Sequence, residues 1–144
     1  MNFSMPEEEE MSIEESQTRW LIDLDWYRQN NRSLYMLARS HICPECTKKL
    51  GAEGKEASED KLLATMRDCC SRSPVFITEQ TPILESIFCL FLANGNQSLN
   101  LEEIGKQLNE RWGGDAYRTS PELLSRLLRH DCYYGVREIK DQPS

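Results

Sequence analysis

The stretch ILESIFCLFL, residues 83–92, is apolar on nearly every side and is followed by Asn94-Gly95-Asn96. A helix with this composition has to be buried in a core. Downstream, the sequence predicts a short strand at 98–99, a helix over 101–112 capped by Asn100, a helix over 121–130 that starts at Ser120-Pro121, and a strand over 133–139. We therefore expect residues 78–144 to form one domain around the helix at 82–92.

Upstream of this stretch, the chain is predicted to be helical from Thr18 to about Ile42, with a break near Asn30-Asn31. The apolar positions recur at helical spacing, at Trp20, Leu21, Leu24 and Tyr27. Residues 47–59 are polar, contain two glycines and are predicted to form a loop. Ser58 is the predicted N-cap of a further helix that ends near Cys70.

Four cysteines in this upstream part are spaced like metal ligands. Cys43 and Cys46 form a C-x₂-C pair, and Cys69 and Cys70 follow 23 residues later. Two such pairs supply the four thiolates of a tetrahedral zinc site. Adjacent cysteines can both reach one ion only if the helix ends there, which Ser71 and Pro74 favour. The sequence therefore predicts structural Zn²⁺ bound by Cys43, Cys46, Cys69 and Cys70.

Alternatives to this ligand set remain open. Cys69 or Cys70 could instead continue the apolar stripe of Leu62 and Met66 as a small core residue, and His41 would then be the substitute ligand. Cys89 lies in the most apolar helix and is expected to be a packing residue.

The net charge of −7 is distributed unevenly. Residues 1–15 carry six Glu and no basic residue, residues 16–77 have a net charge of +2, and residues 78–144 have one of −3. We expect residues 1–15 to be a disordered acidic tail. The sequence has neither an apolar run long enough to span a membrane nor a secretory signal pattern, so a cytoplasmic protein without membrane contact is expected.

No catalytic pattern is found. Phosphate-binding glycine loops and a nucleophile elbow are absent, and the chain has two His. The CPEC pair lacks both the βαβ context of a redox motif and the H-x-E motif of a zinc deaminase. We therefore expect a protein that is not an enzyme and has no small-molecule substrate.

The C-terminal segments ANGNQSLNLEEIGKQLNE and SPELLSRLLRHD resemble a winged-helix module of the kind found in the RNA polymerase delta subunit, and CPEC resembles a zinc knuckle. The expected fold is mainly α, with a helical zinc-knuckle module at 16–77 followed by a winged-helix-like domain at 78–144. The resemblance implies a transcription-associated protein that binds double-stranded DNA through its third helix. The residues expected to contact DNA are Ser125, Arg126 and Arg129 in the groove, and Arg118 and Arg137 on phosphates.

A second hypothesis is an adaptor that contacts a protein, for example one of the transcription machinery, and binds no nucleic acid. Its expected contact surface is an aromatic cluster of Trp20, Trp26, Tyr27 and Tyr35. The net charge of −3 in residues 78–144 favours this alternative, because phosphate contacts dominate the affinity of DNA-binding proteins.

Overall fold

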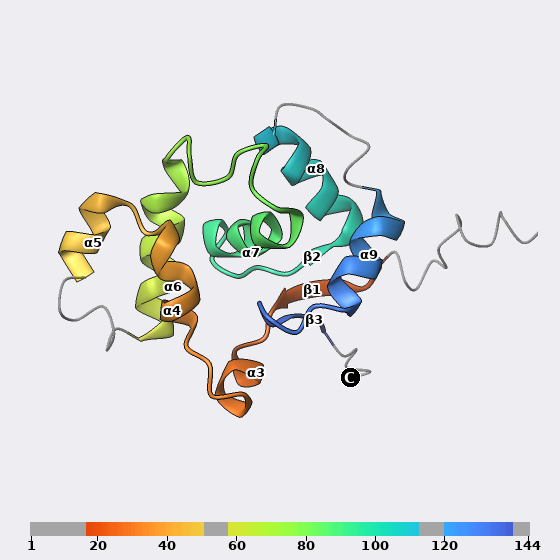
Figure 1. Cartoon of the computed structure of the whole chain (residues 1–144), viewed down its shortest axis with the longest axis horizontal. Coiled ribbons are helices and arrows are strands. Elements are labelled where there is room, and N and C mark those ends of the chain that lie inside the picture. Colours follow the sequence, from red (N-terminus) through yellow and green to blue (C-terminus); the bar gives the residue numbers. More distant parts are fainter. Residues whose placement is uncertain (1–16, 51–57, 113–119, 140–144) are drawn as a thin grey trace, which may run out of the picture.

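The computed structural model describes residues 17–50, 58–112 and 120–139, so the predicted acidic tail lies outside the described residues. The described part is mainly helical with a small three-stranded sheet (Figure 1), which confirms the mainly α fold class. In chain order, the elements are β1 (Arg19–Ile22), α3 (Leu24–Gln29), α4 (Leu34–Ala38), the 3₁₀ helix η1 (Arg39–His41), α5 (Pro44–Leu50), α6 (Glu59–Asp68), the 3₁₀ helix η3 (Cys70–Arg72), α7 (Ile83–Ala93), β2 (Leu99–Asn100), α8 (Leu101–Trp112), α9 (Pro121–Arg129) and β3 (Val136–Glu138).

The central strand of the sheet comes from the N-terminal part of the chain. The predicted helix from Thr18 is wrong at Arg19–Ile22, because these residues form β1 between β2 and β3 in the order β2-β1-β3. Both pairings are antiparallel, and Trp20 lies opposite Leu99 on one side and Glu138 on the other. The side chain of Asn96 extends the pairing, since it accepts from the backbone N–H of Ile22 (2.8 Å) and donates to its carbonyl (2.9 Å).

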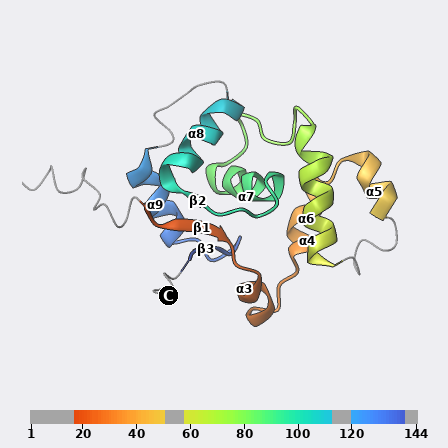
Figure 2. The same ribbon diagram turned by 180° about the vertical axis from the view of Figure 1, so that it is seen from behind.

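Helix α7 occupies the middle of the molecule, as its apolar sequence predicted. Every residue from Ser86 to Leu92 on it is buried. Figures 1 and 2, which view the molecule from opposite sides, both show α6 on one side of α7 and α8 on the other. One cluster of buried side chains joins α6, α7, α8, α9 and β1, so it includes residues on both sides of the predicted boundary at 77/78.

Several helices begin at the capping side chains that the sequence predicted. Asn100 Oδ1 accepts from the backbone N–H of Glu103, and Glu103 Oε1 accepts from that of Asn100, both at 2.9 Å, which is a reciprocal capping box at the start of α8. Ser58 and Ser120 cap α6 and α9 through their hydroxyl oxygens. The predicted break near Asn30-Asn31 is also confirmed, since α3 ends at Gln29 and Asn31 has a φ of +55°.

Two sequence-based predictions in this region are wrong. The predicted loop at 47–59 is wrong at its start, because residues 47–50 belong to α5. The aromatic cluster proposed as a contact surface is not a surface, because Trp20 and Tyr27 are only 3% and 0% exposed and Trp26 and Tyr35 pack against the core. Tyr27 is fixed there by its hydroxyl, which donates to the carbonyl of Tyr134 (2.6 Å).

Candidate metal centre

The four cysteines Cys43, Cys46, Cys69 and Cys70 lie together where α5 meets the end of α6. Cys43 directly precedes α5, and its carbonyl accepts from both the backbone N–H (2.9 Å) and the hydroxyl (3.1 Å) of Thr47. Pro44 is the first residue of α5, a position that tolerates proline because the first N–H groups of a helix have no intrahelical partner. Cys46 follows on α5 and points inward, since it is 1% exposed.

The adjacent residues Cys69 and Cys70 both reach the cluster because helix α6 ends directly before them. Helix α6 ends at Asp68, Cys69 leaves the helical conformation with φ −130° and ψ −65°, and Cys70 begins η3. The predicted condition that the helix ends at this pair is therefore confirmed. The change of backbone direction brings Cys69 and Cys70 to the sulfur of Cys43, which lies 3.6 Å from the sulfur of each.

These distances fit a metal site better than a disulfide. The Sγ atoms of Cys43, Cys46 and Cys70 all lie within 4.8 Å of one another. A tetrahedral site with Zn–S bonds of about 2.3 Å places its sulfurs about 3.8 Å apart. A disulfide needs about 2.05 Å, and all four cysteines are free thiols. The cluster of Cys43, Cys46, Cys69 and Cys70 is thus within metal-binding distance, as the sequence predicted.

Hydrogen bonding and burial act in opposite directions on these thiols. A hydrogen bond from the backbone of Cys46, followed by bonds from the neighbouring thiols, lowers the pKa of Cys43 to about 7. Burial raises the pKa of Cys46 and of Cys70. The cluster without a cation therefore holds at most part of the negative charge of four thiolates. A bound divalent cation would offset that charge, and binding would release the remaining thiol protons.

His41 is directed away from the sulfurs. Its Nε2 lies 3.2 Å from a carboxylate oxygen of Glu85 on α7, and its ring packs edge-on against Phe76 at 6.1 Å. Burial lowers the pKa of His41, and the carboxylate of Glu85 partly counteracts this effect. His41 is therefore not placed as a substitute ligand. The exposed carboxylate of Glu45, which the sequence did not single out, lies within 4.8 Å of the sulfurs of Cys43 and Cys69.

The residues predicted to contact DNA are only partly arranged as expected. Arg126 and Arg129 are exposed on α9, and Arg137 is exposed on β3. The prediction that Ser125 lies on the exposed face of the helix is wrong: Ser125 is 4% exposed, and its hydroxyl accepts from Arg129 Nε at 3.0 Å. Arg118 lies outside the described residues. Cys89 is fully buried, as expected for a packing residue.

The comparisons with known proteins give no relative: no family model, curated protein or solved structure matches the chain. In the described ranges, none of the helices is both long and apolar enough to span a membrane. The candidate site is therefore interpreted from its own geometry.

Proposed function

We propose that the protein is a small DNA-binding regulator whose N-terminal helices are held together by a structural zinc ion. Four thiolates and no open position are typical of structural sites, whereas catalytic zinc sites keep a position for water or substrate. Zinc bound by Cys43, Cys46, Cys69 and Cys70 would join the start of α5 to the end of α6. Soft sulfur ligands favour zinc over magnesium, calcium or manganese.

Metal analysis tests the zinc site directly. The full chain purified with zinc should contain one equivalent, and Cys43→Ser should lose most of it, because the sulfur of Cys43 lies 3.6 Å from those of both Cys69 and Cys70. Cys132→Ser is the matched control, because Cys132 is exposed and is not part of the cluster. A full equivalent of zinc in Cys43→Ser protein would exclude this ligand set.

The order of elements in the C-terminal half supports the DNA-binding part of the proposal. Helices α7, α8 and α9 with β2 and β3 have the helix–strand–helix–helix–strand order expected of a winged helix, and β1 pairs between β2 and β3. In this arrangement α9 is the recognition helix. The observation that carries the proposal is the exposure of Arg126 and Arg129 on α9 with Arg137 on the neighbouring strand.

Fluorescence anisotropy with random-sequence duplex DNA tests this assignment. Zinc-loaded protein should bind more weakly as salt increases, and each lost phosphate contact should reduce the slope of log K against log salt by about 0.9. Arg126→Ala with Arg129→Ala should therefore reduce the slope by up to about 1.8. Arg39→Ala with Arg72→Ala is a control of equal charge, since both residues are exposed and lie on other elements. Equal binding by the two double variants would overturn the role of α9.

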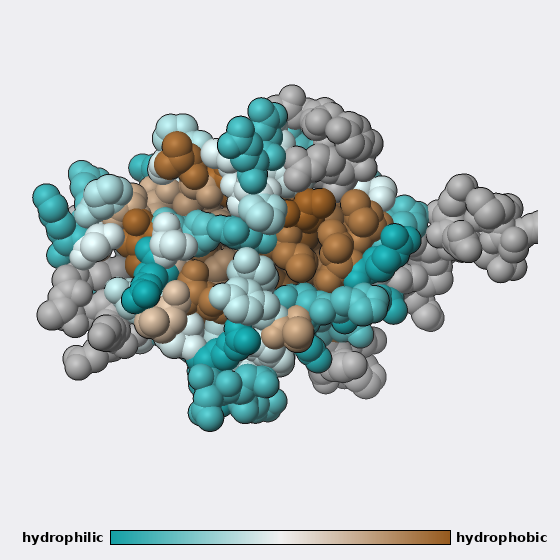
Figure 3. Space-filling model, in the orientation of Figure 1, coloured by the Kyte–Doolittle hydropathy of each residue, from teal (hydrophilic) through white to brown (hydrophobic). Residues whose placement is uncertain are grey.

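A second candidate function, a protein-binding adaptor, is favoured by the apolar side of α9. Leu123 and Leu127 are half-buried on this helix and do not belong to the core cluster or to the residues packed on it. Figure 3 shows an apolar patch over the region in which α8 and α9 lie in Figure 1. If the protein binds no DNA at low salt, a pull-down that compares wild type with Leu123→Ser plus Leu127→Ser would test this alternative.

A further inference from the structure

The cysteine cluster has an exposed side and a buried side. Cys43 and Cys69 are partly exposed, whereas Cys46 and Cys70 are 1% and 0% exposed. The exposed carboxylate of Glu45 lies within 4.8 Å of the sulfurs of Cys43 and Cys69, so these two thiols lie on the side that faces water. Figures 1 and 2 both show α5 at the end of the molecule, beyond α6. A small oxidant dissolved in water therefore reaches Cys43 and Cys69 before the other two cysteines.

Cys43 and Cys69 are also well placed to form a disulfide with each other. Their sulfurs lie 3.6 Å apart, and either thiol can donate a hydrogen bond to the other. A disulfide has an S–S distance of about 2.05 Å, so the two sulfurs have to approach by about 1.5 Å. Cys43 directly precedes α5, and Cys69 lies between α6 and η3. A small movement at these positions does not require either helix to break.

Cys70 is a poorer partner for Cys43, although its sulfur is equally close at 3.6 Å. Cys70 belongs to the buried core cluster, and its sulfur accepts a hydrogen bond from the backbone N–H of Cys43 (3.2 Å). Cys46 belongs to the same core cluster, whereas Cys43 and Cys69 only pack against it. Because cores are close-packed, a disulfide that displaces a core side chain destabilises the fold more than one between Cys43 and Cys69.

We propose that hydrogen peroxide converts Cys43 and Cys69 to a reversible disulfide and that this reaction releases the zinc ion. The proposal rests on the zinc site proposed above. One sulfur of the pair attacks a peroxide oxygen, the O–O bond breaks, and a sulfenic acid and water form. The other sulfur then attacks the sulfenic sulfur, the S–O bond breaks, and a second water leaves. Two electrons pass from sulfur to peroxide, and the two protons come from the thiols or, where the pair is bound to zinc as thiolates, from the solvent.

Oxidation of this pair removes half of the ligands of the metal site. Only Cys46 and Cys70 remain as thiols, whereas zinc sites in proteins have three or four protein ligands. The zinc ion is therefore released, and the disulfide joins the start of α5 to the end of α6 in its place. Reduction by a dithiol restores the ligands, so the site responds reversibly to the oxidant.

The test uses the full chain with Cys132→Ser, because the exposed thiol of Cys132 could otherwise link two copies. Hydrogen peroxide should release one equivalent of zinc to a chromogenic chelator, together with a mass loss of about 2 Da per chain. Tandem mass spectrometry of the tryptic peptide that joins residues 40–48 to residues 68–72 should place the bond between Cys43 and Cys69. Dithiothreitol should restore both the original mass and the bound zinc.

Cys69→Ser in the same chain should prevent most of the disulfide formation, with the Cys132→Ser parent as the matched control. Both chains are compared without metal, because Cys69 is also a proposed ligand. The proposal is overturned if the bond joins Cys43 to Cys70 or to Cys46, or if Cys69→Ser forms a disulfide as fast as its parent. It is equally overturned if zinc stays bound at peroxide concentrations that oxidise the metal-free chain.

The failure of this inference can be distinguished from the failure of the zinc site. A chain that binds no zinc before oxidation overturns the zinc site and, with it, the release of zinc. Disulfide mapping of the metal-free chain decides the pairing of Cys43 with Cys69 in either case.

Discussion

Gly135 lies where the chain entering β3 passes closest to α3. Its φ is +71°, and a Cβ at this position would lie 2.6 Å from Cε3 of Trp26 and 2.7 Å from Cε1 of Tyr27. Neither ring can move easily, because Tyr27 is fully buried and Trp26 packs on the core. Both the backbone conformation and the close approach therefore require glycine here.

We expect Gly135→Ala to lower the free energy of unfolding by about 3 kcal/mol, as the sum of a left-handed backbone penalty and steric overlap in a packed region. Gly95→Ala is the matched control. Gly95 has a similar φ of +73°, but its Cβ would meet only the flexible side chain of Arg67 at 3.3 Å. The control should lose only about 1–2 kcal/mol. Urea unfolding followed by circular dichroism measures both, and equal losses would contradict the steric part of the explanation.

The hydroxyl groups of Tyr27 and Tyr134 and the thiol of Cys89 should limit the stability of the protein at alkaline pH. Burial raises the pKa of Tyr27, and it raises the pKa values of Tyr134 and Cys89 to about 12 each. A group with a raised pKa in the folded state favours folding while it is protonated. Its contribution is complete below the pKa of the unfolded chain and is lost as the pH rises through the folded-state pKa.

The free energy of unfolding should therefore start to fall above about pH 9, where Cys89 would ionise in the unfolded chain, and fall further between about pH 10 and 12 for the tyrosines. Urea unfolding at fixed ionic strength over pH 8–12 measures this dependence. In Tyr27→Phe the decrease between pH 10 and 12 should be smaller, because one of the ionising groups is missing. An unchanged pH dependence in Tyr27→Phe would contradict the assignment of this loss to Tyr27.

At the scale of elements, we expect α5 to depend on the proposed metal site. It has seven residues, a length at which an isolated helix is marginal in water. Among residues 44–48 of α5, the buried side chain is that of Cys46, which belongs to the cysteine cluster. The bound metal would therefore determine whether α5 stays folded against α6.

Removal of the metal with a chelator should increase the rate of trypsin cleavage after the exposed Lys48, because local unfolding of α5 gives the protease access. Cleavage after Arg126 on α9, far from the cluster, is the internal control and should change little. Mass spectrometry of the first fragments distinguishes the two sites. Equal acceleration at both sites would indicate that the metal stabilises the whole chain and not α5 in particular.

The elements that sequence periodicity predicted well are those whose signals are local. The apolar run at 83–92, the caps at Ser58, Asn100 and Ser120, and the spacing of the cysteines each depend on neighbours in the chain, and the structure has all of them. Strand β1 was missed because its four residues fit a helical pattern equally well, and its partners β2 and β3 lie more than 70 residues away. Pairing with distant strands then decided the conformation, as is common for short strands.

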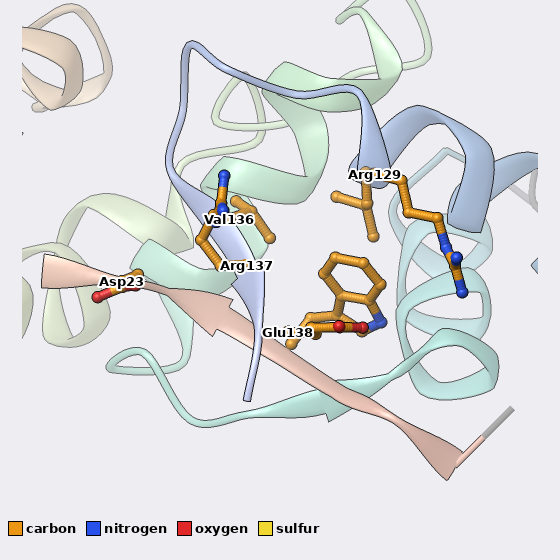
Figure 4. A pocket seen from close by; sticks show the side chains of 7 residues that line it. Asp23, Arg129, Val136, Arg137 and Glu138 are labelled. Carbon is orange, nitrogen blue, oxygen red and sulfur yellow. The ribbon is translucent and has the colours of Figure 1, made fainter. Parts of the chain in front are cut away.

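In the candidate site, too, the sequence predicted the features that depend on local spacing and missed those that depend on distant contacts. The cluster of four cysteines follows from their spacing in the sequence, but the direction of His41 toward Glu85 and the burial of Ser125 depend on contacts between elements. A small cleft between the sheet and α9 could not be predicted from the sequence for the same reason. Its lining includes Trp20 of β1, Leu128 of α9 and Val136 of β3 (Figure 4), so it exists only after β1 has joined the sheet.

At the scale of the whole molecule, we expect residues 78–144 to need the N-terminal strand β1 in order to fold. The predicted two-domain division at 77/78 remains a prediction, and β1 is the element that tests it. Both β2 and β3 pair with β1, and Trp20 and Ile22 from this strand are 3% and 1% exposed in the shared core. Burial of two large side chains contributes about 3–6 kcal/mol, which is comparable with a total stability of about 5–15 kcal/mol.

A chain that begins at residue 17 should therefore unfold cooperatively, as is expected of the full-length protein, whereas a chain that begins at residue 24 should lose its cooperative transition. The first variant removes only residues outside the described part, so it controls for truncation itself. The fragment 78–144 should likewise be unfolded alone and gain structure when a peptide of residues 17–29 is added, because the peptide supplies the missing central strand. Thermal unfolding and amide ¹H–¹⁵N spectra measure these outcomes. A fragment 78–144 that folds alone with native-like shifts would show that β1 is only an accessory to an independent C-terminal domain.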